Sequence, residues 1–207
     1  MSPTHRLADL AYCAIFAALI IVLAFISIPV GAAGVPIVLQ NAAVALTGLV
    51  LGARRGFFSV GLFLLVGLVL PVLAGGRTVI SALGGPTAGY IVGYLLSAAV
   101  AGAIAYRARP GARSGQLVFF TLGAAGALVT QYLAGAIGLM IISGLTVSAA
   151  AVAQIPFLIP DAIKFAAMVA IALGVHAAFP DLLRAGRAQP PAAAMTGQPR
   201  TTGDAEH

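Results

Sequence analysis

Long apolar runs alternate with short polar or glycine-rich connections along the 207-residue chain. A helix needs roughly 20 mainly apolar residues to cross a bilayer. Six runs come close to this length, and we predict a transmembrane helix in each: about 8–28, 37–53, 56–73, 85–106, 115–142 and 156–179. The pattern therefore predicts an all-α integral membrane protein, a bundle of six transmembrane helices.

The basic residues support this count. Most of them fall in the connections that share one side of a six-helix bundle: Arg6, Arg54, Arg55, Arg107, Arg109, Arg113, Arg184 and Arg187. Arg77 falls on the opposite side, and Lys164 lies in or beside the last run. Cytoplasmic loops are enriched in Lys and Arg, so both termini are predicted to be cytoplasmic. We expect a multi-pass protein of the cytoplasmic (inner) membrane.

Composition agrees with a membrane protein. Hydrophobic residues make up 61% of the chain and charged residues 8%, whereas soluble domains carry about 25% charged residues. The net charge of +6 does not indicate nucleic acid, because the basic residues fall in short clusters without an aromatic stacking surface. We expect one transmembrane domain over 1–187. The proline-rich tail 188–207 is predicted to be a disordered cytoplasmic extension.

The connections on the outer side are unusual. Residues 27–41, 73–87 and 143–156 are mostly uncharged, and the first two are rich in glycine and proline. Irregular backbone at membrane depth is tolerated where protein or a cavity surrounds it. We therefore expect these connections to build a cavity on the outer side.

Asp161 and Lys164 are the leading candidates for function. They interrupt the apolar run "IPFLIPDAIKFAAM", and Lys164 is the only lysine in the chain. Residues three apart share a helix face, and an intramembrane charge costs roughly 2.5 to 3.5 kcal/mol at a helix centre. The pair either holds the bundle together as an internal ion pair or binds a small polar ligand, which is the default interpretation for such residues.

Further polar candidates lie near the outer connections. Gln40 and Asn41 open the second predicted helix, and Thr87 and Tyr90 lie near the start of the fourth; these side chains either satisfy backbone groups or bind a ligand. Arg77 is either a solvated loop charge or an attractor for an anionic ligand. His176 is expected at the membrane interface.

Two sets of small residues indicate close helix packing. Gly85, Gly89 and Gly93 recur every four residues, which is best explained by packing against another helix. Ala14 and Ala18 form a small-xxx-small pair in the first predicted helix. They either pack within the chain or form a docking strip for a partner membrane protein.

The chain lacks the motifs of common enzymes. No P-loop, H-E-x-x-H sequence, paired acidic dyad or Gly-x-Ser-x-Gly elbow is present. We expect no enzymatic activity, no cofactor and no metal site. Energy for any transport is expected from a partner.

Four segments resemble the BioY family, the biotin-specific substrate-binding (S) components of energy-coupling factor (ECF) transporters. They are "VPIVLQN", "LGARRGFFSV", "GGPTAGYIVGY" and "IPFLIPDAIKFAAMVAIA", and their order and spacing match over about residues 8–180. One departure is Val38, where the family usually has threonine.

The resemblance implies high-affinity capture of biotin at an outward-facing site. It also implies a transmembrane coupling subunit and two ATP-binding cassette subunits as partners, with Ala14 and Ala18 matching the docking motif and Asp161 and Lys164 matching the ligand-binding Asp-x-x-Lys. Two alternatives stay open: an S component for another vitamin, such as thiamin or riboflavin, and a membrane scaffold subunit that does not transport. Assembly with copies of itself is also left open.

Overall fold

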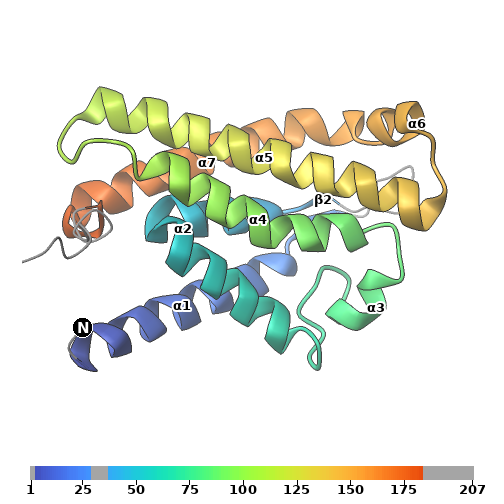
Figure 1. The fold of residues 1–207 in the computed structure, drawn as a ribbon, viewed down its shortest axis with the longest axis horizontal. Helices are drawn as coiled ribbons and strands as arrows, with labels where there is room; N and C mark the ends of the chain where they lie inside the picture. The colour runs from blue at the N-terminus through green and yellow to red at the C-terminus, as the bar shows by residue number, and fades with distance from the viewer. Residues whose placement is uncertain (1–2, 29–36, 184–207) are drawn as a thin grey trace, which may run out of the picture.

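The computed structural model describes residues 3–28 and 37–183. The described part is almost entirely helical (Figure 1). Its elements are α1 (Pro3–Ala24), β1 (Ser27–Ile28), β2 (Ile37–Val38), α2 (Gln40–Val66), α3 (Val79–Leu83), α4 (Ala88–Ala105), α5 (Arg113–Ser143), α6 (Val147–Val152) and α7 (Ile155–Ala178). The predicted tail, 188–207, lies outside the described residues.

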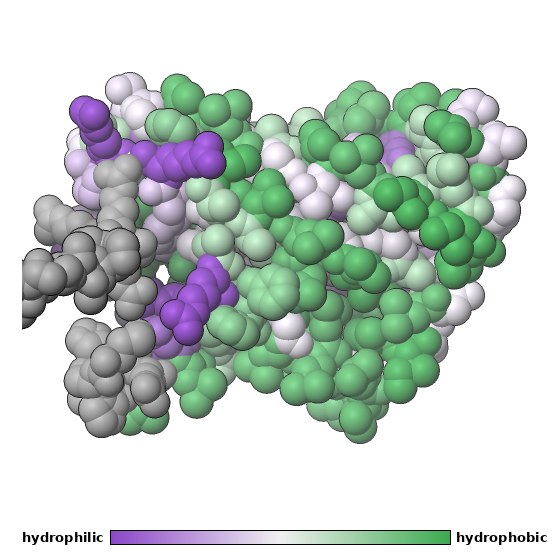
Figure 2. Space-filling view, in the orientation of Figure 1, coloured by the Kyte–Doolittle hydropathy of each residue, from purple (hydrophilic) through white to green (hydrophobic). Residues whose placement is uncertain are grey.

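Among the described residues, five helices are long and apolar enough to cross a membrane: α1, α2, α4, α5 and α7. They cover the six predicted segments, because the second and most of the third lie within α2. Large apolar side chains face outward along these helices, with Ile141 74% exposed. The space-filling view is predominantly hydrophobic, and hydrophilic residues gather at the end that carries the N-terminus (Figure 2). The fold is that of a membrane protein.

Helix α2 reverses its direction at Gly52. This residue has φ 82° and ψ 175°, outside the helical region. A Cβ atom on Gly56 would lie 3.0 Å from the Cα of Gly48, although eight residues of straight helix would separate them by about 12 Å. The two halves of α2 therefore form a tight hairpin. The reversal lies at the end of predicted segment 37–53, two residues before the predicted connection to segment 56–73.

Two side chains from other helices bind backbone carbonyls that the reversal leaves without helical partners. The hydroxyl of Tyr106 donates to the carbonyl of Val50 at 2.6 Å. A ring nitrogen of His176 lies 3.0 Å from the carbonyl oxygen of Leu49. His176 is 2% exposed, so it is buried among the helices, and its position at the membrane interface stays a prediction. Its apolar surroundings include the ring of Phe120, 5.0 Å away between centroids.

The bundle has two distinct ends. At one end, the α2 reversal lies beside the start of α1, where Arg55 and Asp9 form an ion pair of 2.6 Å. The α4–α5 connection lies at this same end (Figure 1). At the opposite end, β1 and β2 pair antiparallel, with Ser27 opposite Val38. The short helices α3 and α6 also lie at that end (Figure 1).

Glycines bring α4 and α5 into backbone contact. A Cβ on Gly89 would lie 2.1 Å from the carbonyl oxygen of Ala134, and one on Gly138 would lie 2.5 Å from the Cα of Gly89. Gly93 also packs closely on α5, whereas a Cβ on Gly85 would meet nothing nearer than 3.7 Å. The packing interpretation of the glycine repeat is confirmed for Gly89 and Gly93 and wrong for Gly85.

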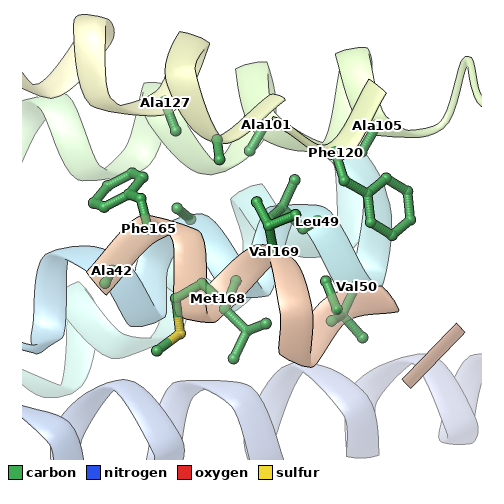
Figure 3. Close-up of a cluster of buried hydrophobic side chains, with 14 of the residues drawn as sticks. Ala42, Leu49, Val50, Ala101, Ala105, Phe120, Ala127, Phe165, Met168 and Val169 are labelled. Carbon is green, nitrogen blue, oxygen red and sulfur yellow. The ribbon is translucent and has the colours of Figure 1, made fainter. Parts of the chain in front are cut away.

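The main core joins α7 to the first half of α2 and to α4 and α5. Phe165, Met168 and Val169 of α7 share one buried cluster with Leu49 and Val50 of α2, and Val169 lies beside Leu49 (Figure 3). Alanines of α4 and α5, including Ala101 and Ala127, close the cluster from the other side. This packing fixes the first turns of α7, which carry Asp161 and Lys164.

Candidate functional site: a polar cavity at the β-hairpin end

A partly open cavity lies between β2, the start of α2, the turn before α3, and helices α4, α5 and α7. It encloses about 610 Å³ of empty space, counting its open mouth. All seven residues predicted to bind substrate line it: Gln40, Asn41, Arg77, Thr87, Tyr90, Asp161 and Lys164. The remaining lining residues are Ile37, Val38, Leu73, Ala74, Ile91, Tyr94, Gln131, Tyr132 and Phe157. Binding of a ligand by the seven residues stays a prediction.

Asp161 and Lys164 form the charged centre of this cavity. They lie on one face of α7, and the Lys164 Nζ is 2.5 Å from the Asp161 Oδ1. The Asp161 side chain is 4% exposed and that of Lys164 is 13% exposed. Asn41 joins them, because its Nδ2 donates to Asp161 Oδ1 at 3.1 Å and its Oδ1 accepts from Lys164 at 2.9 Å.

The two charges differ in how fully they are satisfied. Lys164 donates to Asp161, to Asn41 and, at 2.6 Å, to the backbone carbonyl of Val38, which uses all three ammonium hydrogens. Asp161 accepts from Lys164, Asn41 and, at 2.8 Å, the hydroxyl of Tyr132. A carboxylate has about four lone-pair sites. An incoming N–H group can therefore bind Asp161 directly, whereas Lys164 must exchange a partner. At Val38 the contact uses the backbone carbonyl, which any residue provides, so valine in place of the family's usual threonine leaves this contact unaffected.

Two hydroxyls in the cavity wall have no partner. The Thr87 Oγ1 and the Tyr90 Oη are buried and make no hydrogen bond. Buried polar groups are nearly always hydrogen-bonded, so an unsatisfied hydroxyl requires an explanation. Both residues line the cavity. A polar ligand in the cavity would provide the missing partners.

The two glutamines of the cavity wall, Gln40 and Gln131, donate hydrogen bonds to backbone carbonyls. The Gln40 Nε2 donates to the carbonyls of Val72 at 3.1 Å and Ile20 at 3.4 Å. The Gln131 Nε2 donates to the carbonyl of Asn41 at 3.1 Å and to the Ser97 hydroxyl at 3.1 Å. For Gln40, the amide hydrogens therefore serve backbone groups, and its carbonyl oxygen is the atom left for a ligand.

Arg77 reaches the cavity from a tight turn. Leu73 and Arg77 pair across this turn, and Gly75 and Gly76 adopt φ 75° and 67°, a conformation that glycine adopts without steric cost. The Arg77 Nε donates to the carbonyl of Ala74 at 3.3 Å. With Arg77, Lys164 and Asp161 ionised, the cavity lining carries one net positive charge, which favours an anionic ligand.

Sequence reasoning missed Tyr132, which binds Asp161 directly. Tyr132 lies 29 residues from Asp161 along the chain and only the packing of α5 against α7 brings the two together. It is the one tyrosine of the long apolar run 115–142, and this was the only available signal. The apolar lining residues Ile91 and Phe157 were not predicted either.

Membrane-length helices around one polar cavity define a substrate-binding membrane protein. The chain belongs to the BioY family, whose family model matches residues 1–181. It is 40% identical over 171 residues to the biotin transporter BioY of Rhizobium etli, covering 80% of this chain and 90% of that protein. Identity to the biotin transporter BioY of Rhodobacter capsulatus is 38% over 162 residues, covering 72% and 83%.

A solved structure supports the same assignment. The fold resembles that of the S-component for biotin from an ECF-type ABC transporter, with a TM-score of 0.76 and 30% sequence identity. The similarity covers 86% of this chain and 95% of that one. The predicted family resemblance is confirmed.

Proposed function

We propose that this protein captures biotin from outside the cell as the S component of an ECF transporter. The observation that carries the proposal is the cavity itself, which brings together the seven predicted residues, the Asp161–Lys164 pair among them, from four parts of the chain. Membership of the BioY family supports biotin as the ligand. The protein is not an enzyme in this proposal. ATP hydrolysis is assigned to two ATP-binding subunits joined to it through a transmembrane coupling subunit.

The cavity suits the chemistry of biotin. Biotin has two ureido N–H groups, a ureido carbonyl, a thioether ring and a carboxylate tail. Asp161 has acceptor capacity left for an N–H group, and Lys164 can exchange a partner for an oxygen of the ligand. Charge-assisted hydrogen bonds of this kind are the strong ones. Arg77 is a suitable partner for the carboxylate, and Ile91 and Phe157 provide apolar walls.

We assign the protein to the cytoplasmic membrane with six crossings, each half of α2 forming one. The hairpin at Gly52 supports this assignment, because Gln40 and Val72 meet at one end of it. The end with the reversal carries Arg54, Arg107 and other arginines of the connections. By the positive-inside rule this end is cytoplasmic, together with both termini. The cavity then opens toward the outside.

Ala14 and Ala18 are the proposed docking residues for the coupling subunit. Both are exposed on α1, so packing within the chain does not account for them. Only 17% of the span Leu7–Ala24 is buried. Small side chains on an open helix face allow another helix to approach closely.

The proposal is tested by titrating the purified protein with biotin, thiamin and riboflavin in parallel. We expect biotin to bind far more tightly than the other two, and Asp161→Asn and Lys164→Gln each to weaken it. Thiamin carries a positive charge and meets a positively charged cavity, so it should bind weakly. Tight binding of thiamin or riboflavin would make the protein an S component for that vitamin instead. If none of the three binds, the alternative of a membrane scaffold subunit that does not transport would be favoured.

A further inference from the structure

The ring of Tyr90 packs on α5 at a position that has no side chain. A Cβ atom on the buried Gly135 would lie 2.2 Å from Cε1, 2.3 Å from Cζ and 2.6 Å from Cδ1 of Tyr90. Carbon atoms in contact are about 3.5–4.0 Å apart, so even an alanine at 135 would displace the ring by more than about 1 Å. The absence of a side chain at 135 is therefore what allows Tyr90 its position.

The helices cannot easily separate to make room. Gly89 and Gly138 are in backbone contact next to this position, and Gly93 is packed against Gln131 one turn further along. These contacts set the distance between α4 and α5 on both sides of Tyr90. A methyl group at 135 is therefore relieved more easily by rotation of the Tyr90 ring than by movement of either helix.

The empty space beside Tyr90 is the cavity. The residue lines it, and its hydroxyl is one of the two buried hydroxyls of the cavity wall that have no partner. A ring displaced from Gly135 turns into space that a ligand would occupy and carries its hydroxyl away from its present place. The position of Tyr90 in the cavity wall thus depends on Gly135, which does not itself line the cavity.

We infer that Gly135 is a positioning residue for ligand capture: it holds the Tyr90 ring back against α5 and so keeps the cavity open and the Tyr90 hydroxyl in place. This inference rests on the proposed function, since the ligand it invokes is biotin. It adds to that function a determinant of ligand size outside the lining residues. A larger residue at 135 would narrow the cavity and move the Tyr90 hydroxyl without replacing any residue that lines the cavity.

The test is a double-mutant cycle with biotin titration. Gly135→Ala should weaken biotin binding at least about tenfold, because the Tyr90 ring already occupies the space of the added methyl group and overpacking is costly. In a Tyr90→Ala background the same substitution should change affinity by less than about threefold, since the ring that it displaces is gone. Gly126→Ala is the matched control on α5, because its Cβ would meet only side-chain methyl groups, the Cδ1 of Ile104 at 2.9 Å and the Cγ1 of Val100 at 3.1 Å. It should leave binding unchanged.

A second readout needs no ligand. Thermal unfolding of the four proteins of the cycle should show that Gly135→Ala lowers the melting temperature more in the Tyr90 background than in the Tyr90→Ala background. If Gly135→Ala does not fold, the double variant should regain folding. An equal loss of stability and of affinity in both backgrounds would overturn the inference. If the unchanged protein does not bind biotin, the proposed function fails, and the unfolding cycle alone decides the role of Gly135.

Discussion

Neutralising Asp161 and Lys164 separately and together would distinguish a ligand site from an ion pair that only holds the bundle. The perturbations are Asp161→Asn, Lys164→Met and the double variant. Each single variant leaves one buried charge without its main partner. The double variant removes both charges and leaves a neutral amide beside Asn41 and Tyr132, which can still hydrogen-bond to it.

The structure sets the size of the expected effects. Breaking a buried ion pair by removing one partner typically costs about 3–5 kcal/mol. Asp161 is 3% exposed but keeps Asn41 and Tyr132 when Lys164 is removed. Lys164 keeps Asn41 and the Val38 carbonyl when Asp161 is neutralised, so we expect about 3 kcal/mol for each single variant. Neutral replacement of a whole buried pair is often close to neutral for stability, so the double variant should unfold within about 1 kcal/mol of the unchanged protein.

Binding should respond differently from stability. Hydrogen bonds to charged groups contribute about 1.5–3 kcal/mol each. Loss of one bond from each residue to biotin therefore predicts an affinity at least about 100-fold weaker for the double variant. The assays are denaturant unfolding in detergent micelles and titration with labelled biotin. A double variant that is stable and still binds biotin like the unchanged protein would refute the ligand role of the pair.

Three other variants test separate parts of the structure. Tyr132→Phe removes a donor to Asp161 and should lower stability by about 1–3 kcal/mol in the same unfolding assay; the exposed Tyr12→Phe serves as control, and an equal effect of both would contradict the role of Tyr132. Gly52→Ala should destabilise more than Gly111→Ala, because both glycines have positive φ but only at Gly52 would a Cβ meet the Tyr106 ring, at 3.1 Å; equal losses would show that this contact is unimportant. Ala14→Leu with Ala18→Leu should leave biotin affinity unchanged and abolish co-purification with a co-expressed coupling subunit, whereas retained co-purification would remove α1 as the docking helix.

Local sequence patterns predicted the centre of the site well. The Asp-x-x-Lys spacing places both charges on one face of any helix, and α7 has them 2.5 Å apart. The glycine- and proline-rich connections also indicated the end at which the cavity lies. These features depend on short-range geometry, which a single sequence specifies directly.

Features that depend on packing between helices were harder to predict. The sharp reversal of α2 uses one glycine, with Tyr106 and His176 from other helices binding the freed carbonyls. Nothing near His176 in the sequence indicates that partner, so its contact with the Leu49 carbonyl was not predicted. Tyr132 and Gly135 acquire their roles only because α5 lies against α7 and α4. Such roles follow from tertiary contacts between distant segments.

A crystal structure determined with biotin is the decisive test of the binding site. We expect biotin in the cavity, with an N–H group bound to Asp161, an oxygen bound to Lys164, and the hydroxyls of Thr87 and Tyr90 within hydrogen-bonding distance of the ligand. Biotin bound elsewhere, with the Asp161–Lys164 pair unchanged and the two hydroxyls still without partners, would contradict it.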